Sequence, residues 1–194
     1  MARASEVART TSETDVGVTL ALDGSGTTEV DTGLPFFDHM LQQLGKHAGW
    51  DLKVACSGDL DVDGHHTVED VGLALGQALA EALGDKAGVR RFGSITVPLD
   101  EAAVEVALDL SGRSFVLHEV DVPAETIGTF DTGLVEDFVR AFAQAADLTI
   151  HVRLVSGRSP HHVVEAEFKA LARALGDACA LEGPAGIPST KGTL

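Results

Sequence analysis

The stretch HHTVEDVGLALGQALAEAL at residues 65–83 decides the fold, because a stretch of the same design, HHVVEAEFKALARALGDAC, follows at residues 161–179. Each stretch opens on the pattern HHxxE and continues with apolar residues at helical spacing. One face of the first predicted helix carries Val68, Val71, Leu75 and Leu79, and one face of the second carries Val164, Phe168, Leu171 and Leu175. Two helices that begin with the same element predict a chain made of two related halves.

The segments before the two helices repeat the same order of signals. In the first half, alternating polar and apolar residues predict a hairpin of strands 15–22 and 27–31, then a helix at 35–48 and a short strand at 51–55. In the second half, the predictions are strands at 103–110 and 114–118, a helix at 134–146 and a strand at 148–155. We therefore expect an α+β fold of duplicated β-β-α-β-α halves, with antiparallel sheets and helices packed on one side.

The repeat also divides the chain into segments. The first half-repeat spans residues 1–92, the second spans residues 93–182, and residues 183–194 form a C-terminal tail without helical or strand periodicity. The tail either closes over a site as a lid or ends the chain as a frayed terminus.

Composition excludes several classes of function. The net charge of −16 argues against a nucleic-acid partner, because no net positive field would attract phosphates. The first residues lack an apolar signal region and no run approaches the roughly 20 apolar residues of a membrane span, which predicts neither export nor membrane insertion. Cys56 and Cys179 lie in apolar stretches, so we expect reduced, buried thiols and a cytoplasmic protein.

The HHxxE pattern suits metal binding. The first histidine and the glutamate are four residues apart on a helix and can reach one ion, whereas the second histidine is rotated by about 100° and can serve another. Two such elements predict a two-metal centre. Imidazole and carboxylate ligands without thiolate suit Mn²⁺, Fe²⁺ or Zn²⁺.

His39, in the segment FFDHM, is the best additional ligand, and the matching position of the second half holds Asp137. A carboxylate there can bind a hard ion, or can simply face solvent in the first turn of a helix. His47, His118 and His151 have no counterpart in the repeat, which favours structural roles for them.

Basic residues in loops of this acidic chain predict a phosphate-binding site. Arg90-Arg91, Arg113 and Lys191 would supply the positive charge, and Ser189 or Thr190 a hydroxyl. Lys169 follows Glu165 by one helical turn, so either a salt bridge within the helix or a reach into the site explains it.

Six segments together resemble the imidazoleglycerol-phosphate dehydratase family of histidine biosynthesis: FFDHMLQQLGKHAGWDL, HHTVED, RFGSITVPLDE, DLSGR, HHVVEAEFKALARAL and PSTKG. The resemblance spans nearly the whole chain in the expected order. It implies a ribosomal protein S5 domain 2-like fold, two Mn²⁺ ions per active site, and a homo-oligomer of 24 subunits with active sites between neighbours.

The resemblance also implies roles for individual residues. The metal ligands would be His39, His65, His66, Glu69, His161, His162 and Glu165, with residue 137 as the eighth. Some members have histidine at that last position, from which Asp137 departs. The residues in contact with the substrate would be Glu13, Gln43, Arg91, Arg113, Lys169, Ser189 and Lys191, the last five around its phosphate.

The implied reaction is the elimination of water from D-erythro-imidazole glycerol phosphate to give imidazole acetol phosphate. No carbonyl is present to hold the charge left by proton removal, so the metal-bound imidazole must act as the electron sink. Glu13 and Glu165 are the hypothesised acid and base, without individual assignment. The alternatives are a di-metal hydrolase of a phosphorylated substrate and a metal-storage shell protein.

Overall fold

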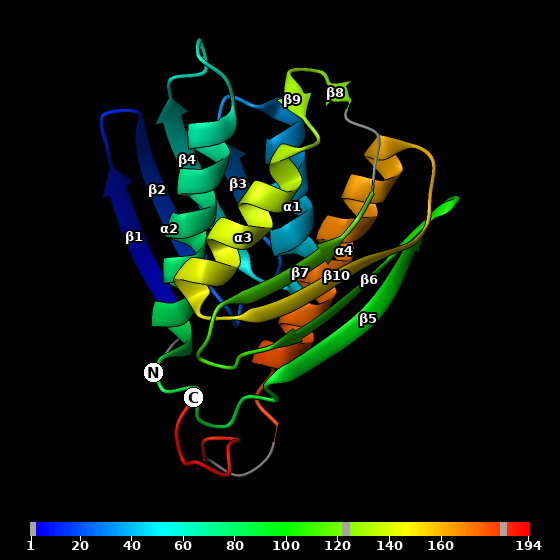
Figure 1. The fold of residues 1–194 in the computed structure, drawn as a ribbon. Helices are drawn as coiled ribbons and strands as arrows, with labels where there is room; N and C mark the ends of the chain where they lie inside the picture. The colour runs from blue at the N-terminus through cyan, green and yellow to red at the C-terminus, as the bar shows by residue number, and fades with distance from the viewer. Residues whose placement is uncertain (1–2, 122–124, 183–185) are drawn as a thin grey trace.

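The computed structural model describes residues 3–121, 125–182 and 186–194. Two four-stranded sheets enclose a layer of four long helices (Figure 1). The first half contains β1 (Ala4–Thr10), β2 (Thr14–Ala21), β3 (Thr28–Asp31), α1 (Pro35–Ala48), β4 (Asp51–Gly58) and α2 (His65–Leu83). The second half contains β5 (Phe92–Leu99), β6 (Ala102–Asp109), β7 (Phe115–Glu119), β8 (Thr126–Ile127), β9 (Phe130–Asp131), α3 (Leu134–Ala146), β10 (Thr149–Ser156) and α4 (Pro160–Cys179).

The two sheets have the same topology, which confirms the duplicated α+β architecture. Their strand orders are β1-β2-β4-β3 and β5-β6-β10-β7. All pairs are antiparallel except β3 with β4 and β7 with β10, which are parallel. A parallel pair needs a crossover connection, and α1 and α3 supply it in the two halves.

Two details of the predicted halves are corrected by the structure. Each half has an additional first strand, β1 or β5, that the predicted β-β-α-β-α order leaves out. Both are edge strands with a single fully buried residue each, Val7 and Gly93. β1 shows no apolar alternation, whereas Ile95, Val97 and Leu99 of β5 alternate with more exposed residues but are only partly buried. The predicted hairpin of strands 15–22 and 27–31 is wrong, because β2 and β3 pair with opposite edges of β4 rather than with each other.

Local sequence explains where the helices that carry the candidate ligands begin. Pro35 opens α1, where its missing N–H costs nothing, and Asp38 accepts hydrogen bonds from Thr32 N at 2.8 Å and Thr32 Oγ1 at 2.6 Å. The Ser159 hydroxyl accepts a hydrogen bond from His162 N at 3.4 Å and caps α4. The HHxxE elements therefore occupy the first turns of α2 and α4.

Glycine allows α2 and α3 to approach closely. A Cβ atom at Gly72 would lie 2.9 Å from Ala141 Cβ, and one at Gly76 would overlap the carbonyl oxygen of Phe142. The two helices thus pack backbone against side chain, and this contact fixes the spacing between the first HHxxE element and the start of α3. Among the residues that the structure describes, no helix has the length and apolar character needed to cross a membrane.

Candidate metal-binding half-sites and phosphate-binding loops

In both HHxxE elements the first histidine and the glutamate are neighbours, as their spacing predicts. His65 Nε2 lies 4.0 Å from Glu69 Oε2, and His161 Nε2 lies 3.2 Å from Glu165 Oε2. The imidazoles of His65 and His161 are 44% and 47% exposed, so an ion and a second molecule can reach them. Phe36 packs edge-on against His161, with ring centroids 5.1 Å apart, and supports that side chain from α1.

Each element receives a further side chain from the other half of the chain. Asp137 Oδ2 on α3 lies 3.4 Å from His65 Nδ1, and His39 Nε2 on α1 lies 3.5 Å from Glu165 Oε2. The equivalent residues 39 and 137 therefore each lie beside the HHxxE element of the opposite half. We call His65, Glu69 and Asp137 the first half-site, and His39, His161 and Glu165 the second half-site.

The first half-site limits what Asp137 can do. Asp137 and Glu69 face different ring nitrogens of His65, Nδ1 and Nε2. An ion binds an imidazole through one nitrogen. If Asp137 and Glu69 both act as ligands in this arrangement, they serve different ions.

The second histidines of the elements turn away from the first ones. The rings of His65 and His66 make an angle of 74°, and those of His161 and His162 an angle of 84°. His66 Nδ1 lies 3.1 Å from Asp59 Oδ2, and a hydrogen bond to Asp59 raises the pKa of His66. Glu13, on the turn between β1 and β2, approaches the other nitrogen, with Oε2 3.7 Å from His66 Nε2.

The counterpart contact of the second element is shorter. His162 Nδ1 lies 2.7 Å from Glu101 Oε2. This hydrogen bond is the largest of the effects that raise the pKa of His162 and lower the pKa of Glu101 to about 2. Sequence reasoning assigns no role to Asp59 or Glu101, although Glu101 ends the segment RFGSITVPLDE.

Glu165 is held in its ionised form. Burial raises its pKa, but the hydrogen bond and charge of Lys169 and the nearby histidines outweigh burial and lower the pKa overall. Lys169 Nζ lies 2.6 Å from Glu165 Oε1, so the predicted salt bridge within the helix is present. Gln43, one turn after His39 on α1, accepts a hydrogen bond at its Oε1 from His47 Nε2 at 3.0 Å.

The described residues of one chain do not form a complete metal site. Within the described ranges, no three His, Cys, Asp or Glu side chains are arranged so that they could hold an ion. The donor atoms themselves, imidazole nitrogens and carboxylate oxygens, fit a borderline or hard divalent cation such as Mn²⁺. The half-sites therefore have suitable chemistry but too few converging ligands.

Four of the five predicted phosphate-binding residues gather at the other end of the molecule, whereas Lys169 lies beside Glu165 of the second half-site. Arg91 Nε donates to Asp109 Oδ1 at 2.7 Å, and Arg91 Nη1 donates to the carbonyl of Pro188 at 2.8 Å, which holds the tail. In the tail, Lys191 N donates to Ser189 Oγ at 3.2 Å. Arg113 is exposed in the turn between β6 and β7. We call Arg91, Arg113, Ser189 and Lys191 the basic end.

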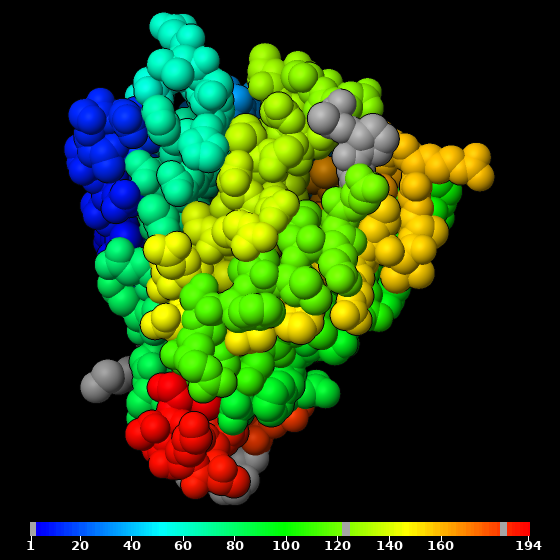
Figure 2. All heavy atoms as spheres, in the orientation of Figure 1, coloured from blue at the N-terminus to red at the C-terminus, as the bar shows by residue number. Residues whose placement is uncertain are grey.

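Helix α4 separates the basic end from the second half-site. Arg91 N donates to the carbonyl of Ala178 at 2.9 Å, near the last residue of α4, whereas His161 is in its first turn. A helix of 20 residues is about 30 Å long. Figure 1 shows the tail below the C-terminal end of α4, and Figure 2 shows the same segment (red) at the end of the molecule opposite the loop before α2 (cyan).

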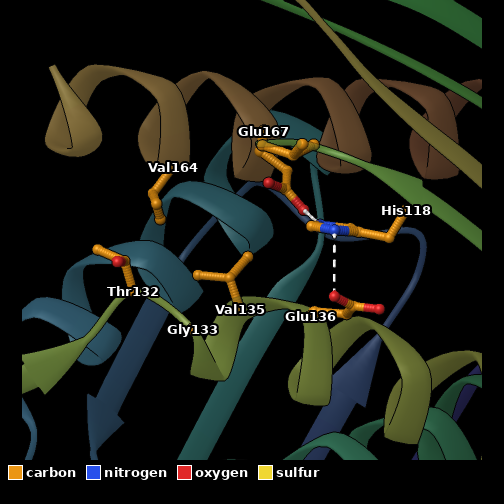
Figure 3. A pocket seen from close by; sticks show the side chains of 8 residues that line it. His118, Thr132, Gly133, Val135, Glu136, Val164 and Glu167 are labelled. Carbon is orange, nitrogen blue, oxygen red and sulfur yellow. Dashed lines mark hydrogen bonds and ion pairs between the residues drawn. The ribbon is translucent and has the colours of Figure 1, made fainter. Parts of the chain in front are cut away.

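His118 belongs to neither half-site. It lines a cavity of about 200 Å³ between β7, α3 and α4 (Figure 3), where its Nε2 lies 2.9 Å from Glu167 Oε1 and its Nδ1 lies 3.8 Å from Glu136 Oε2. The Glu167 side chain is 1% exposed, and its Oε2 atom has no hydrogen-bond partner among the described residues. His118 ties β7 to α4, which supports the structural role predicted for it.

Comparison with known proteins identifies what the chain resembles. The sequence model of the imidazoleglycerol-phosphate dehydratase family matches residues 32–175. The chain is 57% identical over 192 residues to the imidazoleglycerol-phosphate dehydratase of Acidothermus cellulolyticus, across 99% of this chain and 93% of that protein. It is 58% identical over 195 residues to that of Frankia casuarinae, across 100% of both. The crystal structure of the Staphylococcus aureus dehydratase matches with a TM-score of 0.83 at 36% identity, across 92% of this chain and 99% of that chain.

Proposed function

The chain belongs to the imidazoleglycerol-phosphate dehydratase family, and from this premise we propose how its residues bind metal and substrate. Its reaction is the dehydration of imidazoleglycerol phosphate to imidazole acetol phosphate, a hydro-lyase step of histidine biosynthesis. The reaction needs groups that bind the imidazole, groups that move protons and groups that hold the phosphate. We assign imidazole binding to the half-sites, proton transfer to Glu13 together with Glu165, and phosphate binding to the basic end.

The imidazole-binding groups would be two Mn²⁺ ions per active site. Their proposed ligands are His39, His65, His66, Glu69, Asp137, His161, His162 and Glu165. The mixture of imidazole and carboxylate donors on the two half-sites supports a hard or borderline divalent ion. When bound, the ions supply positive charge that stabilises the electron-rich imidazole while the neighbouring hydroxyl leaves.

Glu13 and Glu165 are the proposed proton-transfer residues. Glu165 is kept ionised by Lys169 and the nearby histidines, with its pKa lowered, which suits a metal ligand or a base better than an acid. Glu13 lies on an exposed turn, 49% exposed and within 3.7 Å of His66 Nε2. It can therefore face a substrate bound next to that histidine.

The half-sites and the basic end are far apart in one chain, and from this separation we propose that each active site is formed by residues of more than one copy of the chain. The substrate has only a three-carbon chain between its imidazole and its phosphate, which is far shorter than the roughly 30 Å of α4. One substrate therefore cannot reach the second half-site and the basic end of the same chain. We propose a closed homo-oligomer, of 24 subunits as the sequence resemblance implies, in which neighbouring copies bring these parts together.

Mixing two inactive variants tests the shared site. Glu165→Gln removes a half-site residue and Lys191→Ala removes a basic-end residue, and each variant alone should have little activity. If the two residues of one site come from different chains, joint refolding at equal amounts should restore about one quarter of the sites. If both residues of a site came from one chain, no site in the mixture would be intact and activity would stay at the level of the single variants.

Product analysis tests the reaction itself. The Mn²⁺-loaded protein should convert imidazoleglycerol phosphate to imidazole acetol phosphate, and a metal-stripped sample should not. Release of inorganic phosphate would instead indicate a di-metal hydrolase. A metal-storage protein would retain its function in Arg91→Ala and Lys191→Ala variants, whereas the enzyme should lose turnover and keep its metal.

Two further properties are proposed on the same premise. The small-molecule substrate is a phosphorylated imidazole, and the net charge of −16 disfavours nucleic acid as a partner. Cys56 and Cys179 are both unpaired thiols, which supports a reducing, cytoplasmic location.

A further inference from the structure

We propose that Asp59 and Glu101 are positioning residues that hold His66 and His162 so that Nε2 of each imidazole faces the metal. The inference rests on the metal centre proposed above and adds to it two carboxylates that do not bind the ions themselves. Each carboxylate would accept a hydrogen bond from the Nδ1–H of one histidine, which leaves Nε2 unprotonated with a free lone pair.

In the first half, the backbone fixes Asp59 beside His66. Its carboxylate oxygens lie 3.2 and 3.1 Å from His66 Nδ1. Asp59 N donates to the carbonyl of Glu13 at 3.1 Å, and the carbonyl of Asp59 accepts from Val62 N at 2.8 Å. The backbone of Asp59 is therefore anchored on both sides, and this places its carboxylate beside His66 Nδ1.

In the second half, Glu101 is fixed by its own carboxylate. Oε2 lies 2.7 Å from His162 Nδ1, while Oε1 accepts from Ser159 N at 2.8 Å and from Arg158 N at 3.3 Å. Ser159 is the N-cap of α4. One carboxylate thus joins the β5–β6 turn to the start of the helix that carries the second HHxxE element.

The two contacts are not a by-product of the repeat. Glu101 immediately precedes β6 and therefore corresponds to Glu13, which immediately precedes β2. Asp59 follows β4, and the residue that corresponds to it after β10 is Gly157 or its neighbour, not a carboxylate. The same Nδ1 contact arises from different positions of the two halves, which points to a requirement of the histidines themselves.

The position of Asp59 also explains why Glu13 is not bound to Nδ1 of His66, as its counterpart Glu101 is to Nδ1 of His162. Asp59 occupies the Nδ1 side of His66, so Glu13 is left on the Nε2 side at 3.7 Å, where the metal and the substrate would bind. Its counterpart Glu101 occupies the Nδ1 side of His162. Two equivalent glutamates therefore have different tasks, proton transfer for Glu13 and orientation of a ligand for Glu101.

The experiment measures Mn²⁺ affinity, metal-free stability and Co²⁺ absorption for Asp59→Ala and Glu101→Ala, with Asp61→Ala as the control. Asp61→Ala removes the same charge from the same loop as Asp59→Ala. Loss of a positioning carboxylate should weaken Mn²⁺ binding by about 10–100-fold. Co²⁺ spectra should change in both alanine variants, and the control should match the wild type throughout. Metal-free thermal unfolding should stay close to that of the wild type in Asp59→Ala, whereas Glu101→Ala also loses the hydrogen bonds from Ser159 N and Arg158 N. Glu101→Gln should recover part of the affinity, because its amide oxygen can still accept the Nδ1–H.

Three outcomes would overturn the inference. Wild-type Mn²⁺ affinity in both alanine variants would show that the carboxylates do not position ligands. A collapse of the metal-free protein in Asp59→Ala and in the milder Glu101→Gln would show a structural role instead. If the wild type bound no Mn²⁺ at all, the proposed metal centre and this inference would both be wrong. If the wild type bound Mn²⁺ and were active, and the two alanine variants bound it equally well, only this inference would be wrong.

Discussion

Replacing His118 with alanine should destabilise the protein strongly, because it leaves the carboxylate of Glu167 buried without a partner. His118 and Glu167 are 6% and 1% exposed, and their contact of 2.9 Å is the hydrogen bond that Glu167 makes in the cavity of Figure 3. Removing one member of a buried ion pair costs about 3–5 kcal/mol of unfolding free energy, since the remaining charge stays desolvated.

An exposed ion pair of the same region gives the control. Arg140 pairs with Glu136, and the two side chains are 53% and 42% exposed. Water screens such a pair, so Arg140→Ala should cost about 0–1 kcal/mol. The double variant His118→Leu, Glu167→Met removes both charges and fills the space with apolar groups, and it should be about as stable as the wild type or more so.

Urea unfolding followed by tryptophan fluorescence measures these differences. Trp50 is the one tryptophan of the sequence and is 1% exposed, so its emission should report the loss of the core. All variants are compared at one protein concentration, because assembly would add to the apparent stability. A loss of less than about 1 kcal/mol in His118→Ala, equal to that of the exposed control, or a double variant no more stable than the single one, would refute the buried-pair reasoning.

The remaining predictions concern pH, helix packing and thiol reactivity. Burial lowers the pKa of His118, but the hydrogen bond and charge of Glu167 and the charge of Glu136 outweigh it, so the folded-state pKa lies above the unfolded one. The stabilisation is therefore complete below the unfolded pKa and is lost as pH rises through the folded pKa, and the wild type should lose more unfolding free energy between pH 6 and pH 9 than the double variant. Gly76→Ala should lower the melting temperature despite a helix-propensity gain of about 1 kcal/mol, because the new Cβ would overlap the α3 backbone. Gln77→Ala, at the exposed neighbouring position, is the control and should have little effect. A higher melting temperature in Gly76→Ala would contradict the close packing of α2 and α3. Burial raises the pKa of Cys56 to about 11 and that of Cys179 to about 12, so both thiols should react slowly with Ellman's reagent at pH 8 in the native state and rapidly in urea; fast native labelling would be inconsistent with this environment.

Helices and the repeat could be predicted from the sequence because their signals are local. The apolar spacing of α1 and α3 predicts residues 35–48 and 134–146, which are the observed bounds. The HHxxE elements at the start of α2 and α4 also follow from spacing, since residues four apart on a helix must be neighbours.

Local sequence patterns did not predict the edge strands or which strands pair with each other. β1 buries one residue, Val7, so its sequence does not alternate as a half-buried strand does. The turn after β2 suggests a hairpin, but β4, which follows only after α1, inserts between β2 and β3. Strand pairing depends on distant segments, and hydrophobic periodicity along one segment carries no information about its neighbour.

By itself, the sequence determined that this protein has two ligand-bearing helices, a matching pair at positions 39 and 137, and a set of basic loops. Only the tertiary structure decided that His39 lies beside Glu165 and Asp137 beside His65, and that Asp59 and Glu101 hold the second histidines. It also placed the basic end a helix length away from the second half-site. The physical reason is that spacing within a helix is set by covalent geometry and local hydrogen bonds, whereas contacts between halves are set by how their apolar faces pack.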